Sequence, residues 1–369
     1  MAIAGTCVWE VRTTGNDNNG GGYVPGAGTD YSQQDTPQLT VTDAAATGTT
    51  NLSSATGGFT SSMVNNIVNV VGQGRRQITA FVNSNNVTCG ADWGTFSGAT
   101  ANVGGSVASY AVACGAAVAG SGSAYNRIYL TGSFTISSTS TNVANGLPRP
   151  PSYCVSEGYA TTRGDGGRAT LTCSGITSQG IVGFFANTNS VVFKNIAVDG
   201  ANLSSITGFS ATTNTSRYIN CRAYRCTTGF NSSGNRCSFI LCEAELGNNG
   251  FVVNGTSAYR CVAKSTLSSG FSSSGNSGAL TECIAWNCWS GFTDAHGYYH
   301  RCVAYNPGSV GFVIPDNKGA AMIECISWSA GTYGATVSYP TLFLNNAEGD
   351  SGTAADNAGL STRRMEIFA

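Results

Sequence analysis

Six segments decide the fold of this chain: YINCRAY (218–224), FILCEAE (239–245), AYRCVAK (258–264), LTECIAW (280–286), YHRCVAY (299–305) and MIECISW (322–328). The cysteines at their centres are Cys221, Cys242, Cys261, Cys283, Cys302 and Cys325, at intervals of 21, 19, 22, 19 and 23 residues. A Gly-Phe pair recurs in phase with them, ending at Phe209, Phe230, Phe251, Phe271, Phe292 and Phe312. Two independent markers that keep one period over five or more units indicate a solenoid.

The length of the repeat and its lack of helical periodicity predict the kind of solenoid. A unit of about 20 residues accommodates three short strands and three turns, which is one rung of a parallel β-helix. Rungs stacked at about 4.8 Å supply one another's backbone hydrogen bonds. Leucine-rich repeats have a similar period, but the Leu-x-x-Leu-x-Leu frame that they need is absent. We therefore predict an all-β fold, a right-handed parallel β-helix with about 20–21 residues per rung.

Alternation along each segment assigns side chains to the inside or the outside of the rung. Cys and the Ala or Ser two residues later share one face, and their small size suits a narrow interior. The residue before each Cys faces out, and the last four of these alternate in sign, so that neighbouring rungs pair opposite charges. They are Arg260, Glu282, Arg301 and Glu324. We expect the Gly of each Gly-Phe pair to permit a turn with positive φ, and the Phe to stack inside the core.

The rest of the chain is less regular. Residues 1–104 are expected to form an N-terminal arm and a loop-rich β region, because residues 1–50 are rich in Gly, Thr and Asn. Residues 105–119, GSVASYAVACGAAVA, are the best helix candidate, with Ala-rich apolar spacing and Gly close to both ends. The β-helix with this helix is expected to span residues 105–335, and residues 336–369 are expected to be a polar tail.

A family resemblance appears once these segments are combined. The helix, RIYLTGSFTIS (127–137), GYATTRGDGG (158–167) and the repeated rungs resemble the right-handed parallel β-helix superfamily, which includes pectate lyases and phage tailspikes. The resemblance implies that the helix caps the open N-terminal end of the core. The opening stretch VWEVRTTGNDNNGGGYVPGAGTDYSQQD (8–35) also resembles the starts of β-helix proteins encoded by phages. The fold hosts enzymes, adhesins and inert structural parts, so the resemblance does not assign a function.

Composition bounds the function. Net charge is −1, only 10% of residues are charged and no basic run occurs, so we expect no nucleic-acid partner. No segment approaches the 18 or so apolar residues of a membrane span, so we expect no membrane insertion. With no C-x-x-C pair and only two histidines, we expect no metal and no cofactor. The N-terminus lacks the basic start and apolar run of a secretory signal, so either a signal was removed or the protein leaves the cell by another route.

Few residues are candidates for catalysis. Pectate-lyase-like enzymes resemble one another in acidic calcium ligands and an Arg base, but the carboxylates here are few. Glu243 and Glu245 lie two apart on one strand face, with Tyr224 and Lys264 expected around Glu245 as a solvated surface ladder. A second group lies in the variable part of one rung and in the next rung, namely Asp294, His296, His300 and Asp316. A His with two Asp and Arg301 nearby could act in acid–base chemistry. Because nothing else converges there, we expect a polar loop and no catalytic residue.

The aromatic residues form a better candidate for binding. Three residues after each Cys the chain places Tyr224, Glu245, Lys264, Trp286, Tyr305 and Trp328, so the C-terminal part of this outward column is aromatic. With Trp289 nearby, these rings are expected to contact either a second subunit or a glycan, a plain surface being the third possibility. The six stacked cysteines are expected to stay reduced. The other eight could form disulfides after release into an oxidising medium.

These observations favour a non-enzymatic structural or surface component of a phage virion, such as a tailspike, fibre or capsid-decoration protein. It would be made in the host cytoplasm and form a homo-oligomer, with a trimer expected by analogy with the family. Its partners would be other virion proteins and, through the aromatic residues, a host surface polysaccharide. The first alternative is a polysaccharide lyase or glycoside hydrolase of the same fold. The second is a bacterial adhesin, extracellular or at the cell surface.

Overall fold

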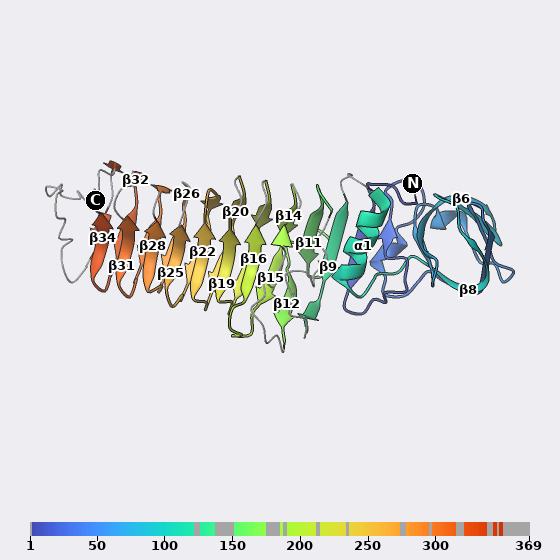
Figure 1. Cartoon of the computed structure of the whole chain (residues 1–369), viewed down its shortest axis with the longest axis horizontal. Coiled ribbons are helices and arrows are strands. Elements are labelled where there is room, and N and C mark those ends of the chain that lie inside the picture. The colour runs from blue at the N-terminus through green and yellow to red at the C-terminus, as the bar shows by residue number, and fades with distance from the viewer. Residues whose placement is uncertain are drawn as a thin grey trace. The chain divides into compact units, whose positions relative to one another are not determined.

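The computed structural model of the chain describes residues 2–121, 126–136, 151–174, 185–186, 190–211, 215–233, 236–273, 278–294, 297–314, 321–337, 342–344 and 347–349 (Figure 1). The chain divides into two compact units. The first comprises Met1–Phe134 and Pro148–Ala169, and the second comprises Thr135–Leu147 and Thr170–Ala369. Strand β10 (Ser133–Ile136) lies where the sequence passes from one unit to the other.

The first unit contains a closed antiparallel barrel with the strand order β3-β4-β7-β6-β5-β8. Its strands are β3 (Leu39–Thr47), β4 (Asn51–Ser53), β5 (Ile67–Val70), β6 (Gly74–Asn83), β7 (Asn86–Cys89) and β8 (Thr95–Val103), with short 3-10 helices η1 (Tyr31–Gln33) and η2 (Ser61–Met63). Apolar side chains such as Leu52, Phe59, Ile78 and Val87 fill its interior. The expected arm and loop-rich region is therefore a small folded domain.

A small sheet in the same unit carries the single α-helix of the described residues. The elements are β1 (Val8–Arg12), β2 (Gly22–Tyr23), β9 (Arg127–Thr131), β11 (Val155–Tyr159) and α1 (Tyr110–Ser121). Strand β1 pairs antiparallel with β2 and parallel with β9, and β9 pairs parallel with β11. Helix α1 packs against β1 and β9, close to where the sequence placed a helix. No helix in the described part of the chain has the length and apolar character needed to cross a membrane.

The second unit is the solenoid, and its strands stack in three parallel sheets (Figure 1). The first sheet contains β14 (Val192–Lys194), β17 (Arg217–Ile219), β20 (Ser238–Ile240), β23 (Ser257–Tyr259), β26 (Gly278–Thr281), β29 (Gly297–His300), β32 (Ala321–Ile323) and β35 (Leu342–Leu344). The second contains β12 (Ala169–Cys173), β15 (Ile196–Asp199), β18 (Arg222–Tyr224), β21 (Glu243–Glu245), β24 (Val262–Lys264), β27 (Ile284–Trp286), β30 (Val303–Tyr305), β33 (Ile326–Trp328) and β36 (Ala347–Gly349). The third contains β13 (Phe185–Ala186), β16 (Thr207–Ala211), β19 (Thr228–Ser232), β22 (Asn249–Val253), β25 (Ser269–Ser273), β28 (Ser290–Asp294), β31 (Val310–Ile314) and β34 (Tyr333–Val337).

The parallel β-helix expected from the repeat is thus confirmed, and it extends further than the repeat indicated. Strands β35 and β36 pair with β32 and β33 in the same register as earlier rungs. The expected boundary at residue 335 was therefore wrong, because two strand segments beyond it belong to the solenoid. Residues 350–369, the remainder of the expected polar tail, lie outside the described residues.

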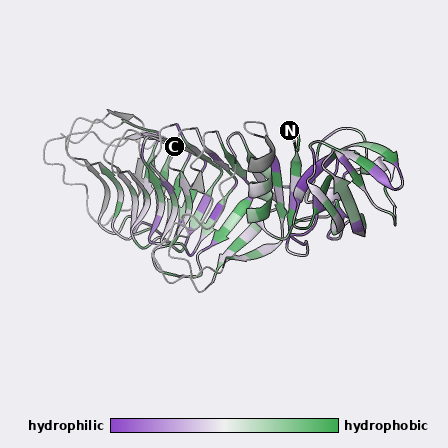
Figure 2. Ribbon diagram, turned by 45° about the vertical axis from the view of Figure 1, so that its right-hand side comes forward, coloured by the Kyte–Doolittle hydropathy of each residue, from purple (hydrophilic) through white to green (hydrophobic). Residues whose placement is uncertain are grey.

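The interior of the solenoid is built from columns of identical side chains. The six phenylalanines of the Gly-Phe pairs stack with ring centroids 4.7 to 4.9 Å apart and planes within 4° to 7° of parallel. Cysteine and alanine form the adjoining columns and are buried. Hydropathy colouring shows hydrophobic residues recurring along the stacked strands (Figure 2). The assignment of Cys, Ala and Phe to the interior is confirmed.

The glycine of the Gly-Phe pair has a different role from the one expected. Gly229 lies inside strand β19 and is not among the residues with positive φ. A Cβ atom built on it would lie 2.7 Å from Ala244 Cβ and 2.7 Å from the Gly250 carbonyl oxygen. The same conflict recurs at Gly208, Gly250, Gly270 and Gly291. These glycines therefore provide room where the third sheet approaches the alanine column, and the expected turn with positive φ was wrong.

The turns of positive φ lie at two other positions of every rung and are occupied by residues other than glycine. The residue before each Cys has φ between 50° and 55°, from Asn220 to Glu324. The fourth residue after each Cys has φ between 48° and 55°, from Arg225 to Ser329. Each such residue costs about 1–2 kcal/mol relative to ordinary backbone. This backbone strain occurs at every corner because a residue in the left-handed conformation turns the chain sharply between two short strands.

We predict opposite outcomes for two substitutions at these positions. Gly229→Ala should lower the free energy of unfolding by about 1–3 kcal/mol, because the methyl group meets backbone and a packed alanine. Leu241→Gly should leave it unchanged or higher, because Leu241 is half exposed and has a φ of 55° that glycine adopts without strain. Guanidinium denaturation measures both. Wild-type stability for Gly229→Ala would contradict the close-approach explanation.

All fourteen cysteines are free thiols and all are buried. In the column, each thiol from Cys221 to Cys302 donates to a carbonyl oxygen of the preceding rung, at Sγ–O distances of 3.3 to 3.6 Å. Among the cysteines outside the column, burial raises the pKa of Cys89 and Cys154 to about 12. At neutral pH these thiols therefore carry almost no reactive thiolate.

A thiol titration tests this arrangement. We predict that a disulfide-exchange reagent such as DTNB leaves the native protein unmodified at pH 8 and titrates fourteen thiols after unfolding in guanidinium. The buried side chains explain the first result, and the absence of cross-links explains the second. Fewer than fourteen thiols in the unfolded protein would show that some of the cysteines outside the column pair as disulfides.

Candidate functional site

The outer face of the second sheet of the solenoid changes in character along its length. Each strand presents two outward residues, the first and third after the column cysteine. On β18 and β21 these are Arg222, Tyr224, Glu243 and Glu245. On β27, β30 and β33 they are Ile284, Trp286, Val303, Tyr305, Ile326 and Trp328. One continuous sheet therefore carries a charged surface followed by an apolar, aromatic one.

The charged surface is an ion-pair ladder between neighbouring rungs. Arg222 NH2 lies 2.5 Å from Glu245 Oε2, and Lys264 Nζ lies 2.5 Å from Glu243 Oε1. Lys264 thus contacts Glu243, where the sequence had placed it beside Glu245. Each of the two carboxylates is thus paired with a cation of a neighbouring rung. The interpretation of Glu243 and Glu245 as a surface ladder agrees with these contacts.

The apolar surface contains three aromatic rings in register, Trp286, Tyr305 and Trp328, which we call the aromatic row. Their exposed fractions are 47%, 39% and 48%, and the first two ring centroids are 4.9 Å apart. The rings are neither packed into the core nor covered by another described segment. Large aromatic side chains left half exposed in a line mark an interaction surface.

Trp289 lies beyond the row, after the corner that follows β27, and is 59% exposed. A Cβ built on Gly308 would lie 3.0 Å from Trp289 Cε3, so the indole ring lies against the backbone of the next rung. This contact fixes the position of the ring while leaving one side open. Trp289 therefore continues the aromatic surface around the corner of the solenoid.

Polar side chains lie along both edges of the aromatic row. On the edge after each strand, Asn306 Nδ2 donates to Asn287 Oδ1 over 2.9 Å, and both residues are exposed. On the edge before each strand, Arg260 pairs with Glu282 at 2.5 Å and Arg301 with Glu324 at 2.6 Å. These two ion pairs confirm the alternating charges expected from the sequence. The row is thus an apolar strip bordered by hydrogen-bonding groups.

Two of the four expected acid–base candidates, Asp294 and His300, lie in described strands, and these strands belong to different sheets. Asp294 ends β28 in the third sheet, whereas His300 ends β29 in the first sheet. His300 Nε2 lies 3.9 Å from Glu324 Oε2. His296 and Asp316 lie outside the described residues. Within the described part of the chain, no cluster of three or more His, Cys, Asp or Glu side chains is arranged to hold a metal ion.

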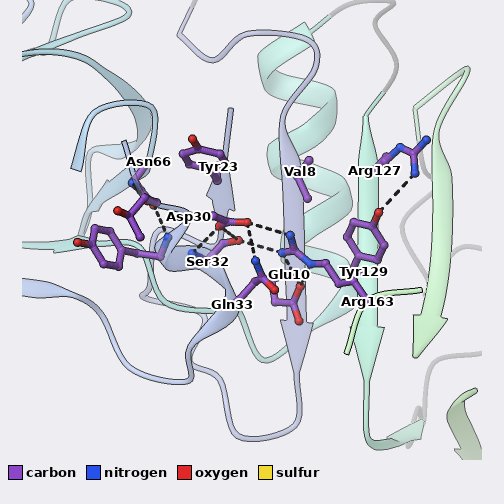
Figure 3. Close-up of polar contacts among 12 residues, drawn as sticks. Val8, Glu10, Tyr23, Asp30, Ser32, Gln33, Asn66, Arg127, Tyr129 and Arg163 are labelled. Atoms are coloured by element: carbon purple, nitrogen blue, oxygen red, sulfur yellow. Dashed lines mark hydrogen bonds and ion pairs between the residues drawn. The ribbon is translucent and has the colours of Figure 1, made fainter. Parts of the chain in front are cut away.

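A polar network that the sequence did not reveal lies in the first unit, around Glu10 (Figure 3). The Glu10 side chain is fully buried. Its carboxylate accepts hydrogen bonds from Arg12 Nε at 3.1 Å, from Arg163 Nε at 2.8 Å and from the Tyr159 hydroxyl. Arg163 NH1 also donates to Asp30 Oδ2 at 2.9 Å, and its guanidinium lies 4.6 Å from the centroid of the Tyr129 ring. Burial, followed by the charge of Glu10, raises the pKa of Tyr159.

The network holds three segments of the first unit together. Asp165 accepts hydrogen bonds from the backbone N–H groups of Thr161, Thr162 and Gly167 and so shapes the loop that carries Arg163. Arg163 then joins this loop to β1 and to the segment before η1. Since Glu10 has no solvent access, no substrate can reach it. One feature of the sequence pointed to this network. Only 10% of the residues are charged, so that the charged residues Glu10, Arg163 and Asp165 stand out in their segments.

We predict that Glu10→Gln lowers the free energy of unfolding by about 1–3 kcal/mol, because it removes the buried charge to which the partly buried Arg163 and Arg12 guanidinium groups both donate. Guanidinium denaturation provides the measurement. The matched control is Glu282→Gln, which removes one partner of an exposed pair and should leave the transition midpoint unchanged. Equal effects of the two substitutions would contradict the role assigned to the network.

Fold and surface together define the second unit as a parallel β-helix with an exposed aromatic strip. No protein-family model matches the chain, and no curated protein matches its sequence. Among solved structures, pectate lyase Pel9A is similar with 18% identity over 64% of this chain and 72% of that chain, at a TM-score of 0.41. The catalytic domain of a GH87 α-1,3-glucanase in complex with tetrasaccharides shows 9% identity over 90% of each chain, at a TM-score of 0.38. These likenesses are too distant to assign an activity to this chain.

Proposed function

We propose that the protein binds a polysaccharide chain along the aromatic row of its solenoid. The observation that carries the proposal is the alignment of Trp286, Tyr305 and Trp328 on three successive strands, each ring about half exposed. A sugar ring has apolar C–H faces and polar hydroxyl edges. A flat aromatic side chain packs against the former while hydrogen-bonding groups beside it bind the latter.

The form of the surface supports a linear, repeating ligand. The aromatic rings recur at the spacing of neighbouring strands, about 4.8 Å, along the axis of stacking. The Asn287–Asn306 pair follows one edge of the row and the two Arg–Glu pairs follow the other, so that amides are available at one edge and charged groups at the other. Ile284, Val303 and Ile326 lie beside the rings, and the polar groups along the edges of this strip can bind the hydroxyl groups of a sugar chain.

Binding is proposed without catalysis. Glu243 and Glu245 lie on the same sheet as the row, so a long ligand would pass over them, but Arg222 and Lys264 occupy both carboxylates. That the protein is part of a phage virion stays a prediction. In a virion, such binding would attach the particle to a host surface polysaccharide. An adhesin of a bacterial surface would use the same contacts.

Affinity measurements on aromatic variants test the proposal. Trp286→Ala and Trp328→Ala should each weaken binding by roughly tenfold, because each removes a stacking surface worth about 1 kcal/mol or more. The control is Phe81→Ala, which removes an aromatic side chain of similar exposure from barrel strand β6 of the first unit. A panel of bacterial and plant polysaccharides is screened by affinity electrophoresis, and the strongest ligand is then measured by calorimetry.

The outcomes separate the alternatives. Roughly tenfold weaker binding in both tryptophan variants, with wild-type binding in Phe81→Ala, supports the proposal. No retained polysaccharide, together with a change from oligomer to monomer in the tryptophan variants by light scattering, would assign the aromatic row to a subunit contact instead. Reducing ends or unsaturated sugars released from a bound polysaccharide would show that the protein is a hydrolase or a lyase.

A further inference from the structure

A concave site lies in the first unit, far in sequence from the aromatic row. It is a pocket of about 480 Å³ between helix α1 and the start of barrel strand β6. Its walls are apolar where Ile3, Ala91, Val112 and Ala116 line it. The polar contribution comes from two consecutive arginines, Arg75 and Arg76, and no acidic residue lines the pocket.

Arg75 is held in place by backbone carbonyl groups. Its Nε donates to Gly20 O at 3.1 Å, and its NH2 group donates to Asn19 O at 2.9 Å and to Asp17 O at 2.5 Å. Neutral carbonyls fix the guanidinium but do not cancel its charge. Burial lowers the pKa of Arg75, and the nearby charge of Asp17 offsets part of this effect. Arg75 is thus a largely buried cation without a direct carboxylate contact.

Arg76 is fixed by an aromatic ring. Its guanidinium carbon lies 4.7 Å from the centroid of the Trp93 ring, and its NH1 donates to Arg75 O at 2.9 Å. The Nε atom is buried and has no hydrogen-bond partner within the described residues. The two guanidinium groups are therefore oriented in advance, and Arg75 NH1 and Arg76 NH2, which make no hydrogen bond within the described residues and are not buried, remain open to a ligand.

Most described arginines are either ion-paired or exposed, and Arg127, Arg217 and Arg236, which have no carboxylate within 4 Å among the described residues, are exposed to solvent, whereas Arg75 and Arg76 are partly buried. A carboxylate lies within 4 Å of each of Arg12, Arg163, Arg222, Arg225, Arg260 and Arg301. Neither Arg75 nor Arg76 has such a partner in the described part of the chain. In a protein with so few charges, two adjacent cations that face an apolar concavity favour an anion supplied from outside.

We propose that this pocket binds the carboxylate of a small organic acid whose carbon body is apolar. Arg75 NH1 and Arg76 NH2 can each donate to one oxygen of a carboxylate, and Ile3, Ala91, Val112 and Ala116 cover the carbon body. Inorganic phosphate would meet the same cations but would leave the apolar walls in contact with water. The ligand class therefore combines one negative charge with a body about the size of a benzene ring.

Helix α1 offers a variant that fills the pocket without touching the arginines. Gly115 lines the pocket, and a Cβ built on it meets no other atom within 4 Å. Gly115→Phe should therefore fold and place a ring in the ligand's space, because glycine is also the weaker helix former. Ala111→Phe is the matched control, since Ala111 is an exposed residue of the same helix that does not line the pocket. Arg76→Gln removes the charge itself.

Calorimetric titration of the full chain with benzoate is the test, with benzamide as the uncharged analogue and inorganic phosphate as the purely ionic one. We expect saturable binding of benzoate and at least tenfold weaker binding of benzamide and phosphate. Arg76→Gln should weaken benzoate binding at least tenfold, Gly115→Phe should abolish it, and Ala111→Phe should leave it unchanged. Equal binding of benzoate and benzamide, wild-type binding by a folded Gly115→Phe variant, or no saturable benzoate binding would each overturn the proposal.

Discussion

The rest of the solenoid depends on the hydrogen bonds between rungs. Each strand bonds to the equivalent strand of the next rung in a fixed register, so that equivalent residues lie directly above one another. A residue type can therefore occupy a column only if its side chain packs well against the side chains directly above and below it, at the distance between neighbouring strands. Phenylalanine stacks, alanine and cysteine fit side by side, and arginine alternates with glutamate. The regularity of the sequence follows from this requirement.

Only the outward columns are free to change along the axis, and they are where this chain differs from rung to rung. On the second sheet the column three residues after Cys passes from Tyr224 through Glu245 and Lys264 to Trp286, while the inward Ala column changes only to Ser327 at its end. The interior columns thus determine the distance between neighbouring strands, and the outward columns place different side chains at that distance. A repetitive core is compatible with a specific binding strip.

The features that could be predicted from the sequence are those that recur once in every repeat. Cys221 and its equivalents, together with the Gly-Phe pairs, were enough to derive the rungs, the interior columns and the aromatic surface. The role of Gly229 was missed because a glycine needed for close approach and one needed for positive φ look the same in a sequence. The left-handed corners at Leu241 and its equivalents carry no shared residue type, so no pattern identifies them.

Non-periodic structure was harder to predict. The barrel depends on antiparallel pairs with register shifts, for example between Val41 and Ala44, which leave no repeating signal. The Glu10–Arg163 contact joins residues 153 positions apart, so neither residue indicates its partner. The Arg75 and Arg76 pocket combines β6 with helix α1 in the same way. Long-range contacts between unlike elements escape a sequence analysis based on repetition.

The vertical register has one more consequence, for how such a chain can evolve. Duplicating a stretch of about 21 residues within the solenoid adds a complete rung, since every column then continues through the new copy. The flanking rungs keep their neighbours and need no compensating change. A duplication that includes Trp286 or Tyr305 would lengthen the aromatic row by one ring. The reach of the surface can therefore grow in single steps by a common genetic event, while its chemistry and packing are inherited intact.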